Sequence, residues 1–111
     1  MKIMILANND VGLYKFRREL LETLLEEHEV HIVLPDGSFV AEMIRMGCIY
    51  HKVEFQRRGT NPVRDFALLR RYSALIREIA PDAVLTYTIK PNIYGGIACT
   101  WRKVPYIANI T

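Results

Sequence analysis

The sequence predicts a single α/β domain over residues 1–111, with a Rossmann-like, doubly wound parallel sheet of about five strands and helices on both faces. Short apolar runs of strand length alternate with longer segments whose apolar residues recur at helical spacing. Such alternation indicates βαβ units and right-handed crossovers. The length of 111 residues suits one domain, and a composition of 50% hydrophobic and 24% charged residues is typical of a globular protein.

The first half of the chain predicts two buried strands, each followed by a helix. Residues Lys2–Asn8 form a nearly continuous apolar run, which suits a strand buried on both faces. Apolar residues then recur at helical spacing as far as Glu27, in one stripe made of Leu13, Phe16, Leu20, Leu21 and Leu24. The run Val30–Leu34 predicts a second strand. Ser38 is expected to cap a short helix after it, which ends at Gly47.

The second half predicts three more strands and two more helices. Residues Cys48–Phe55 predict the third strand, and Asn61-Pro62 begins a helix, because asparagine caps free N–H groups and proline suits the first helical position. This helix runs to Ala80 on the apolar stripe Phe66, Leu69, Tyr72, Ile76 and Ile79. The remaining elements are a strand at Ala83–Tyr87, a helix at Ile93–Arg102 and a strand at Val104–Asn109. Gly95-Gly96 predicts that the last helix lies close to the sheet.

Positive charge is concentrated in the second half. Residues 1–55 carry six Lys/Arg and nine Asp/Glu, whereas residues 56–111 carry nine and three, for a net charge of +6. Arg64, Arg70, Arg71 and Arg77 should lie on the face of the third helix opposite its apolar stripe. Such a row is either a solvated surface or a basic face that rests against anionic lipid headgroups. We expect an anionic partner and no nucleic acid.

The cysteines and the hydropathy pattern predict a reduced, cytoplasmic protein. Cys48 and Cys99 lie far apart, with no histidine at metal-ligand spacing, and the N-terminus carries no secretory signal. We therefore expect both to be core residues and expect no metal site. No apolar run approaches the ~20 residues needed to cross a bilayer. Membrane contact is therefore expected to be peripheral.

The loop after the first strand is a candidate binding site, because ligands of open α/β sheets lie beyond the carboxyl ends of the strands. Asn9 and Gly12 stand at the start of the following helix, where free N–H groups can meet an anion and glycine allows close backbone approach. Alternatively, Gly12 serves only the turn. The Gly-x-Gly-x-x-Gly fingerprint is absent, so we expect no NAD cofactor.

The loop Gln56–Asn61 is the most informative segment. Arg57, Arg58, Thr60 and Asn61 combine fixed charge with oriented donors at a helix start, and these are the groups that hold phosphate. The alternative is a solvated surface loop.

A third group of polar residues follows the fourth strand. Thr88, Lys90 and Asn92 supply a hydroxyl, a cation and an amide beside a helix N-terminus. These groups suit the binding of a sugar or phosphate, and they suit helix capping nearly as well.

No complete catalytic set is predicted. His28, His31 and His51 share no common spacing. Asp10 and Asp36 end the first two strands, but Asp10 has no acidic neighbour and no lysine ends the fifth strand. A phosphate-accepting acidic pocket is therefore not expected.

Four segments resemble the N-terminal domain of bacterial family 4 glycosyltransferases: Asn8–Arg17, Arg57–Pro62, Leu85–Gly96 and Tyr106–Thr111. The resemblance covers essentially the whole chain. Arg-Arg-Gly-Thr-Asn-Pro and Thr-Ile-Lys-Pro-Asn are its most specific parts, and they look like segments of enzymes that assemble capsular polysaccharide, O-antigen or lipid-linked oligosaccharide. The resemblance implies a two-domain GT-B enzyme that transfers a sugar from a nucleotide-sugar donor with retention of configuration and without a required metal.

The resemblance also implies roles for the candidate residues. The N-terminal domain of such enzymes mainly binds the acceptor, commonly a polyprenyl-diphosphate-linked sugar at the inner membrane face. By position, Gly12 would line the interdomain cleft near the donor phosphates, and Thr88 and Lys90 would form the cleft floor. The residues expected to face the acceptor diphosphate are Arg57, Arg58, Thr60 and Asn61.

The chain departs from the family in one respect. The second domain, which in this family holds the nucleotide and a paired-glutamate motif, has no counterpart in the sequence. We therefore expect the acceptor-binding half of a glycosyltransferase that is inactive alone. The second hypothesis is a non-catalytic binding or regulatory subunit that needs a separate donor-binding partner. The third hypothesis is a flavodoxin-like receiver or nucleotide-binding domain, although the sequence lacks the fingerprint residues of these domains.

Overall fold

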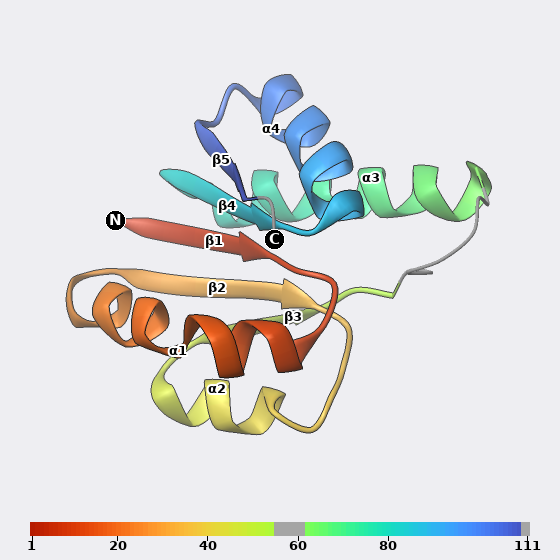
Figure 1. The fold of residues 1–111 in the computed structure, drawn as a ribbon. Helices are drawn as coiled ribbons and strands as arrows, with labels where there is room; N and C mark the ends of the chain where they lie inside the picture. The colour runs from red at the N-terminus through yellow and green to blue at the C-terminus, as the bar shows by residue number, and fades with distance from the viewer. Residues whose placement is uncertain (55–61, 110–111) are drawn as a thin grey trace.

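The computed structural model describes residues 1–54 and 62–109, and its strands form one parallel sheet in the order β3-β2-β1-β4-β5 (Figure 1). The strands are β1 (Lys2–Leu6), β2 (Glu29–Leu34), β3 (Ile49–Lys52), β4 (Ala83–Tyr87) and β5 (Tyr106–Asn109). The helical elements are α1 (Asp10–Glu27), α2 (Val40–Met46), α3 (Pro62–Ile79), the π-helical segment η1 (Pro91–Gly95) and α4 (Gly96–Arg102). The predicted doubly wound α/β fold is confirmed.

Helices cover both faces of the sheet (Figure 1). Alternate residues of a strand point to opposite faces, so Ile3 and Ile5 pack in the core beneath α1 and α2, whereas Met4 and Leu6 pack in the core beneath α3 and α4. The central strand β1 pairs with β2 on one side and with β4 on the other. The strand order therefore reverses beside β1, and the carboxyl ends of β1 and β4 flank the topological switch point.

Two residues that we predicted in apolar stripes are exposed instead. The side chain of Phe16 is 74% exposed and that of Phe66 is 57% exposed. The backbone of α1 leaves helical geometry at Arg17 (φ −125°, ψ 17°), so the stripe expected for a continuous helix does not hold there. The first turns of α3, from Pro62 to Ala67, are exposed except for the half-buried Asp65, which indicates that no sheet lies beneath them.

The helix after β4 begins earlier than predicted and lies close to the sheet. The π-helical segment starts at Pro91, where we expected the helix to start at Ile93. A Cβ atom on Gly95 would lie 2.6 Å from Leu6 Cδ1, so only glycine permits this approach. The close packing expected from Gly95-Gly96 is thus confirmed. The third strand, by contrast, is shorter than the predicted Cys48–Phe55.

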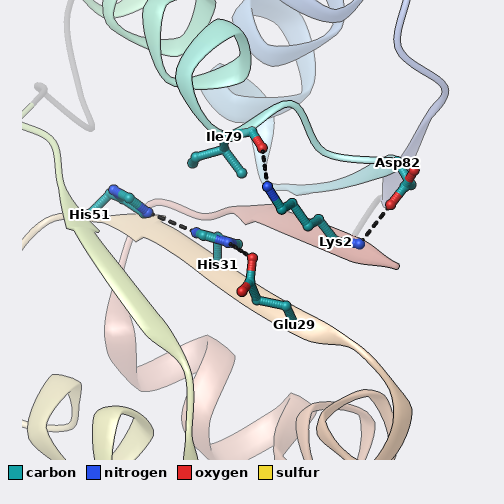
Figure 2. A network of polar contacts seen from close by, with 6 residues as sticks. All are labelled: Lys2, Glu29, His31, His51, Ile79 and Asp82. Atoms are coloured by element: carbon teal, nitrogen blue, oxygen red, sulfur yellow. Dashed lines mark hydrogen bonds and ion pairs between the residues drawn. The ribbon is translucent and has the colours of Figure 1, made fainter.

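A polar network lies on the α3 side of the sheet (Figure 2). His31 Nε2 lies 2.7 Å from Glu29 Oε2, and His31 Nδ1 lies 3.0 Å from His51 Nε2. Since the carboxylate accepts, a neutral His31 ring carries its proton on Nε2, and its Nδ1 then accepts from His51. Nearby, the Lys2 ammonium donates to the Ile79 carbonyl at 3.2 Å. The two histidines, which shared no spacing pattern in the sequence, are brought together by pairing of β2 with β3.

This histidine pair predicts a loss of stability in mild acid. Burial, His31 and Arg71 lower the pKa of His51 from its usual 6.5, while Glu78 acts in the opposite direction. Just below pH 6.5, His51 therefore binds a proton more readily in the unfolded chain than in the folded protein. The stability that is present above pH 6.5 is lost as the pH falls towards the lowered pKa of the folded state. The hydrogen bond with His31 lowers the pKa of Glu29, which adds a further loss at more acidic pH.

Urea unfolding at about pH 8 and about pH 5.5 measures this effect. We expect a smaller free energy of unfolding at the lower pH. A His51→Gln variant, whose amide can still donate to His31, should show a weaker pH dependence between these two values. An undiminished pH dependence in this variant would contradict the assignment.

Candidate functional site

A pocket of about 430 Å³ opens at the carboxyl ends of β1 and β4. It lies at the topological switch point, where open α/β sheets bind their ligands. Its polar lining comes from Asn8, Asn9, Gly12, Arg17 and Thr88, and its apolar lining comes from Ala7, Leu13, Phe16 and Tyr87. Of the nine residues predicted as binding residues, the pocket therefore brings together Asn9, Gly12 and Thr88.

Asn9 shapes the wall of this pocket by capping α1. Its backbone is extended, and its Oδ1 accepts the Gly12 N–H at 2.7 Å. Its amide nitrogen donates to Asn8 Oδ1 at 2.8 Å, which orients both side chains. The Gly12 N–H is therefore not one of the free N–H groups that we expected at this helix N-terminus. Because Gly12 has no side chain, it lines the pocket with backbone atoms alone.

Arg17 is a pocket cation that sequence reasoning missed. The break in α1 falls at this residue, and its guanidinium carbon lies 5.4 Å from the centroid of the Tyr87 ring. Tyr87 is only 7% exposed, and burial raises the pKa of its hydroxyl while Arg17 acts in the opposite direction. A cation–π contact to a buried ring holds the guanidinium in place. No pattern in the sequence marks this pairing, because Arg17 reads as one charge among several on a helix.

Thr88 has a backbone conformation that is rare for its residue type. Its φ of 73° lies in the left-handed region, which branched side chains seldom adopt. Its hydroxyl donates to the Tyr87 carbonyl, and its own carbonyl accepts the Asn92 N–H at 2.9 Å. Strained residues of this kind persist where the surroundings impose them, and they cluster at binding sites. The strained backbone makes Thr88, at the end of β4, a candidate site residue.

Lys90 is not among the residues that line the pocket. Its ammonium lies 2.9 Å from Asp65 Oδ1, and the side chains are 14% and 15% exposed. The Tyr94 hydroxyl donates to the other oxygen of Asp65 at 3.1 Å. Both hydrogen bonds lower the pKa of the Asp65 carboxyl group, and the bond from Lys90 has the larger effect. Lys90 therefore ties the first turn of α3 to the segment after β4.

Asn92 is likewise engaged within the fold. Its Oδ1 accepts from the Thr86 hydroxyl at 2.7 Å, and its amide nitrogen donates to the Asn109 carbonyl at 2.9 Å. The two bonds join η1 to the ends of β4 and β5. The side-chain oxygen and one N–H of Asn92 are thus both bonded within the protein. Asn92 therefore stabilises the contact of η1 with β4 and β5.

The remaining four predicted site residues, Arg57, Arg58, Thr60 and Asn61, lie outside the described residues. The described chain resumes at Pro62, one turn before Asp65. Because Asp65 is bound to Lys90, the point where the chain resumes is fixed beside the segment that follows β4.

Asp10 has a structural role that corrects our expectation for Ser38. The N-cap of α2 is Phe39, and no side-chain bond caps it. Asp10, the first residue of α1, accepts the Phe39 N–H with its Oδ2 at 2.6 Å and is only 6% exposed. A buried carboxylate accepts a stronger hydrogen bond than a hydroxyl does, and it suits a helix N-terminus. Asp10 thus joins the start of α1 to the β2–α2 loop.

The described residues place further bounds on the site. Within residues 1–54 and 62–109, no group of three or more His, Cys, Asp or Glu could hold a metal ion. Cys48 and Cys99 are buried free thiols, as predicted, and burial raises the pKa of each to about 11. In the same part of the chain, no helix combines the length and apolar character that a membrane span requires.

The strand order and the switch-point pocket define a Rossmann-like α/β domain, a fold that solved glycosyltransferase structures share. The chain belongs to the glycosyl transferase 4-like family, whose model matches residues 2–111. It is 24% identical over 110 residues to the N,N'-diacetylbacillosaminyl-diphospho-undecaprenol alpha-1,3-N-acetylgalactosaminyltransferase of Campylobacter jejuni. That match covers 96% of this chain and 28% of the relative, so the chain spans just over a quarter of the relative's length.

Solved structures share this fold at low sequence identity. A glycosyltransferase from Rickettsia africae matches with a TM-score of 0.80 and 17% identity, over 96% of this chain and 28% of its own. MurG from Acinetobacter baumannii matches with a TM-score of 0.75 and 13% identity, over 98% and 33%. A putative UDP-N-acetylglucosamine 2-epimerase from Listeria monocytogenes matches with a TM-score of 0.73 and 16% identity, over 96% and 29%. Transferases and epimerases thus share the architecture.

Proposed function

We propose that this chain is the acceptor-binding part of a retaining glycosyltransferase that moves a sugar from a nucleotide-sugar to a glycan on a polyprenyl diphosphate. A second domain or a partner subunit would bind the donor. Family membership supports the sugar transfer, and the name of the Campylobacter jejuni relative, which acts on a diphospho-undecaprenol-linked sugar, supports the lipid-linked acceptor.

The observation that carries the proposal is Arg17, held on the Tyr87 ring at the pocket wall. A guanidinium offers paired donors that match phosphate oxygens. The amides of Asn8 and Asn9 and the exposed ring of Phe16 supply the polar and apolar surfaces that suit a sugar. A pocket with one cation, two amides and aromatic walls therefore fits a sugar diphosphate better than an uncharged glycan.

The acceptor chemistry implies where the protein would work. A polyprenyl chain holds its diphosphate at a membrane surface, so the enzyme would be cytoplasmic and peripheral on the inner membrane face. The pathways that use such acceptors make capsule, O-antigen or lipid-linked oligosaccharide. We propose that Arg57 and Arg58 meet the acceptor diphosphate there, with Thr60 and Asn61 as further donors.

A binding measurement tests this proposal. Vesicles that carry a polyprenyl-diphosphate-linked sugar are compared with vesicles that carry the same polyprenol without diphosphate. We expect an Arg57→Ala/Arg58→Ala double variant to bind the diphosphate vesicles at least about tenfold more weakly, since charge-assisted bonds contribute ~1.5–3 kcal/mol each.

The control removes the same charge elsewhere. Arg18 and Arg45 are exposed and form surface ion pairs with Glu22 and Glu42. An Arg18→Ala/Arg45→Ala variant should keep the affinity of the unaltered chain within about twofold, because neither arginine lines the pocket or belongs to the Gln56–Asn61 loop. The loss of two surface ion pairs should also leave the folded domain stable. If both double variants bind alike, the arginine loop does not recognise diphosphate.

A further inference from the structure

A second hollow lies between α3 and α4, remote from the switch-point pocket. It has a volume of about 540 Å³ and is lined by Arg70, Ser73, Ala74, Arg77, Glu78 and Arg102, which we call the arginine groove. It shares no lining residue with the pocket at β1 and β4. The two hollows also lie on different sides of the sheet, because α1 covers one face while α3 and α4 cover the other.

The groove is built by contact between the two helices. Arg102, in the last turn of α4, donates from its Nε to Ser73 Oγ at 2.9 Å. Ser73 is only 7% exposed, so this bond anchors the base of the guanidinium at the bottom of the hollow. The tie uses one of the five donors of Arg102 and leaves four for a ligand.

The charge in the groove is not balanced by the protein. Three guanidinium groups line it with one carboxylate, that of Glu78. Within the part of the chain that the structure describes, no carboxylate forms an ion pair with Arg70, Arg77 or Arg102. Like charges that line one hollow repel one another, and an anion bound between them reduces this repulsion.

We propose that the arginine groove binds a phosphate group, separately from acceptor binding in the pocket. Guanidinium forks match phosphate oxygens in pairs, and three forks around one hollow can surround a single tetrahedral anion. The proposal is narrower than a basic helix face, because Arg64 and Arg71 do not line the groove while Arg102 of α4 does. The phosphate comes either from an anionic lipid headgroup or from a free phosphate compound.

Trp101 is a natural reporter for this site. It is the single tryptophan of the chain, it precedes Arg102, and its side chain is 59% exposed. Its fluorescence should therefore respond when an anion or a lipid surface meets the groove. The 111-residue chain is titrated with inorganic phosphate and, separately, with vesicles of phosphatidylcholine with and without phosphatidylglycerol.

We expect a saturable change in Trp101 emission in at least one of the two arms. Saturation by inorganic phosphate identifies a free phosphate compound as a ligand. A blue shift only with phosphatidylglycerol vesicles identifies the headgroup, and either result supports the groove. An Arg70→Ala/Arg77→Ala variant should weaken the response about tenfold or more, since charge-assisted bonds are lost.

Two controls separate the groove from general charge and from the pocket. Arg18→Ala/Arg45→Ala removes the same charge outside the groove, and Arg17→Ala alters only the pocket. Both should leave the Trp101 response unchanged. The proposal is overturned if no emission change occurs in either arm, or if the groove variant and the controls respond with equal affinity. Since the pocket is not involved, that failure would leave the acceptor proposal standing.

Discussion

Replacing Arg17 with alanine should weaken binding of a soluble acceptor analogue by about 10- to 100-fold, because a charge-assisted bond to phosphate contributes ~1.5–3 kcal/mol. The analogue is a monosaccharide joined through a diphosphate to a short prenyl chain. Arg17 lines the pocket, and its guanidinium is held 5.4 Å from the Tyr87 ring centroid. Little side-chain freedom remains to be lost on binding, so the full contribution of the bond is expected to appear in the affinity.

Isothermal titration calorimetry measures this effect, with two further variants. Arg17→Lys keeps the charge but loses the planar fork, so its affinity should lie between those of the unaltered chain and Arg17→Ala. Arg18→Ala removes the neighbouring exposed arginine and should bind like the unaltered chain. All variants should unfold at similar urea concentrations. Equal dissociation constants for Arg17→Ala and Arg18→Ala would falsify the assignment of Arg17 to the acceptor.

Replacing Gly37 with alanine should lower the free energy of unfolding by about 3 kcal/mol, through overpacking and the loss of a buried hydrogen bond. The new Cβ atom would lie 2.3 Å from Asp10 Oδ1 and 2.4 Å from Asp10 Cγ. Asp10 cannot move away without releasing the Phe39 N–H, which it accepts at 2.6 Å. The substitution should therefore separate the start of α1 from the β2–α2 loop.

A double-mutant cycle in urea unfolding isolates this mechanism. In an Asp10→Ala background the carboxylate is absent, so Gly37→Ala should add little further destabilisation. Gly12→Ala is the matched glycine control, because its Cβ would lie 3.4 Å from the nearest atom, Asn9 Oδ1, in a helical turn. It should change stability by less than about 0.5 kcal/mol. Equal costs for Gly37→Ala in both backgrounds would rule out the contact with Asp10 as the cause.

One of the two segments on which the family resemblance chiefly depends has a divided role in the structure. Within Thr-Ile-Lys-Pro-Asn, Thr88 lines the pocket, whereas Lys90 is bound to Asp65 and Asn92 joins η1 to β4 and β5. A residue pattern that resembles a binding motif can therefore include residues that hold the site together. The polar composition of this segment suits both roles, which is why sequence reasoning left binding and capping as alternatives.

Much of the architecture followed from local patterns. Apolar runs such as Val30–Leu34 and the helical spacing of Leu69, Tyr72, Ile76 and Ile79 predicted the order and type of the elements, because burial imposes its period on the sequence. The burial of Phe16 and Phe66 was predicted wrongly. Periodicity assumes a straight helix that lies entirely over a sheet, and α1 breaks at Arg17 while the first turns of α3 are exposed.

The sequence by itself determined the fold class, the edge of the sheet where the pocket lies and the excess of positive charge in the second half, since all three depend on local composition and strand order. Only the tertiary structure decided which residues meet: Arg17 with Tyr87, Asp10 with the β2–α2 loop, and Arg102 with Ser73. Each of these contacts joins segments far apart in the chain. A single side chain bears no local mark of a distant partner, so only packing of the helices on the sheet could reveal the pairs.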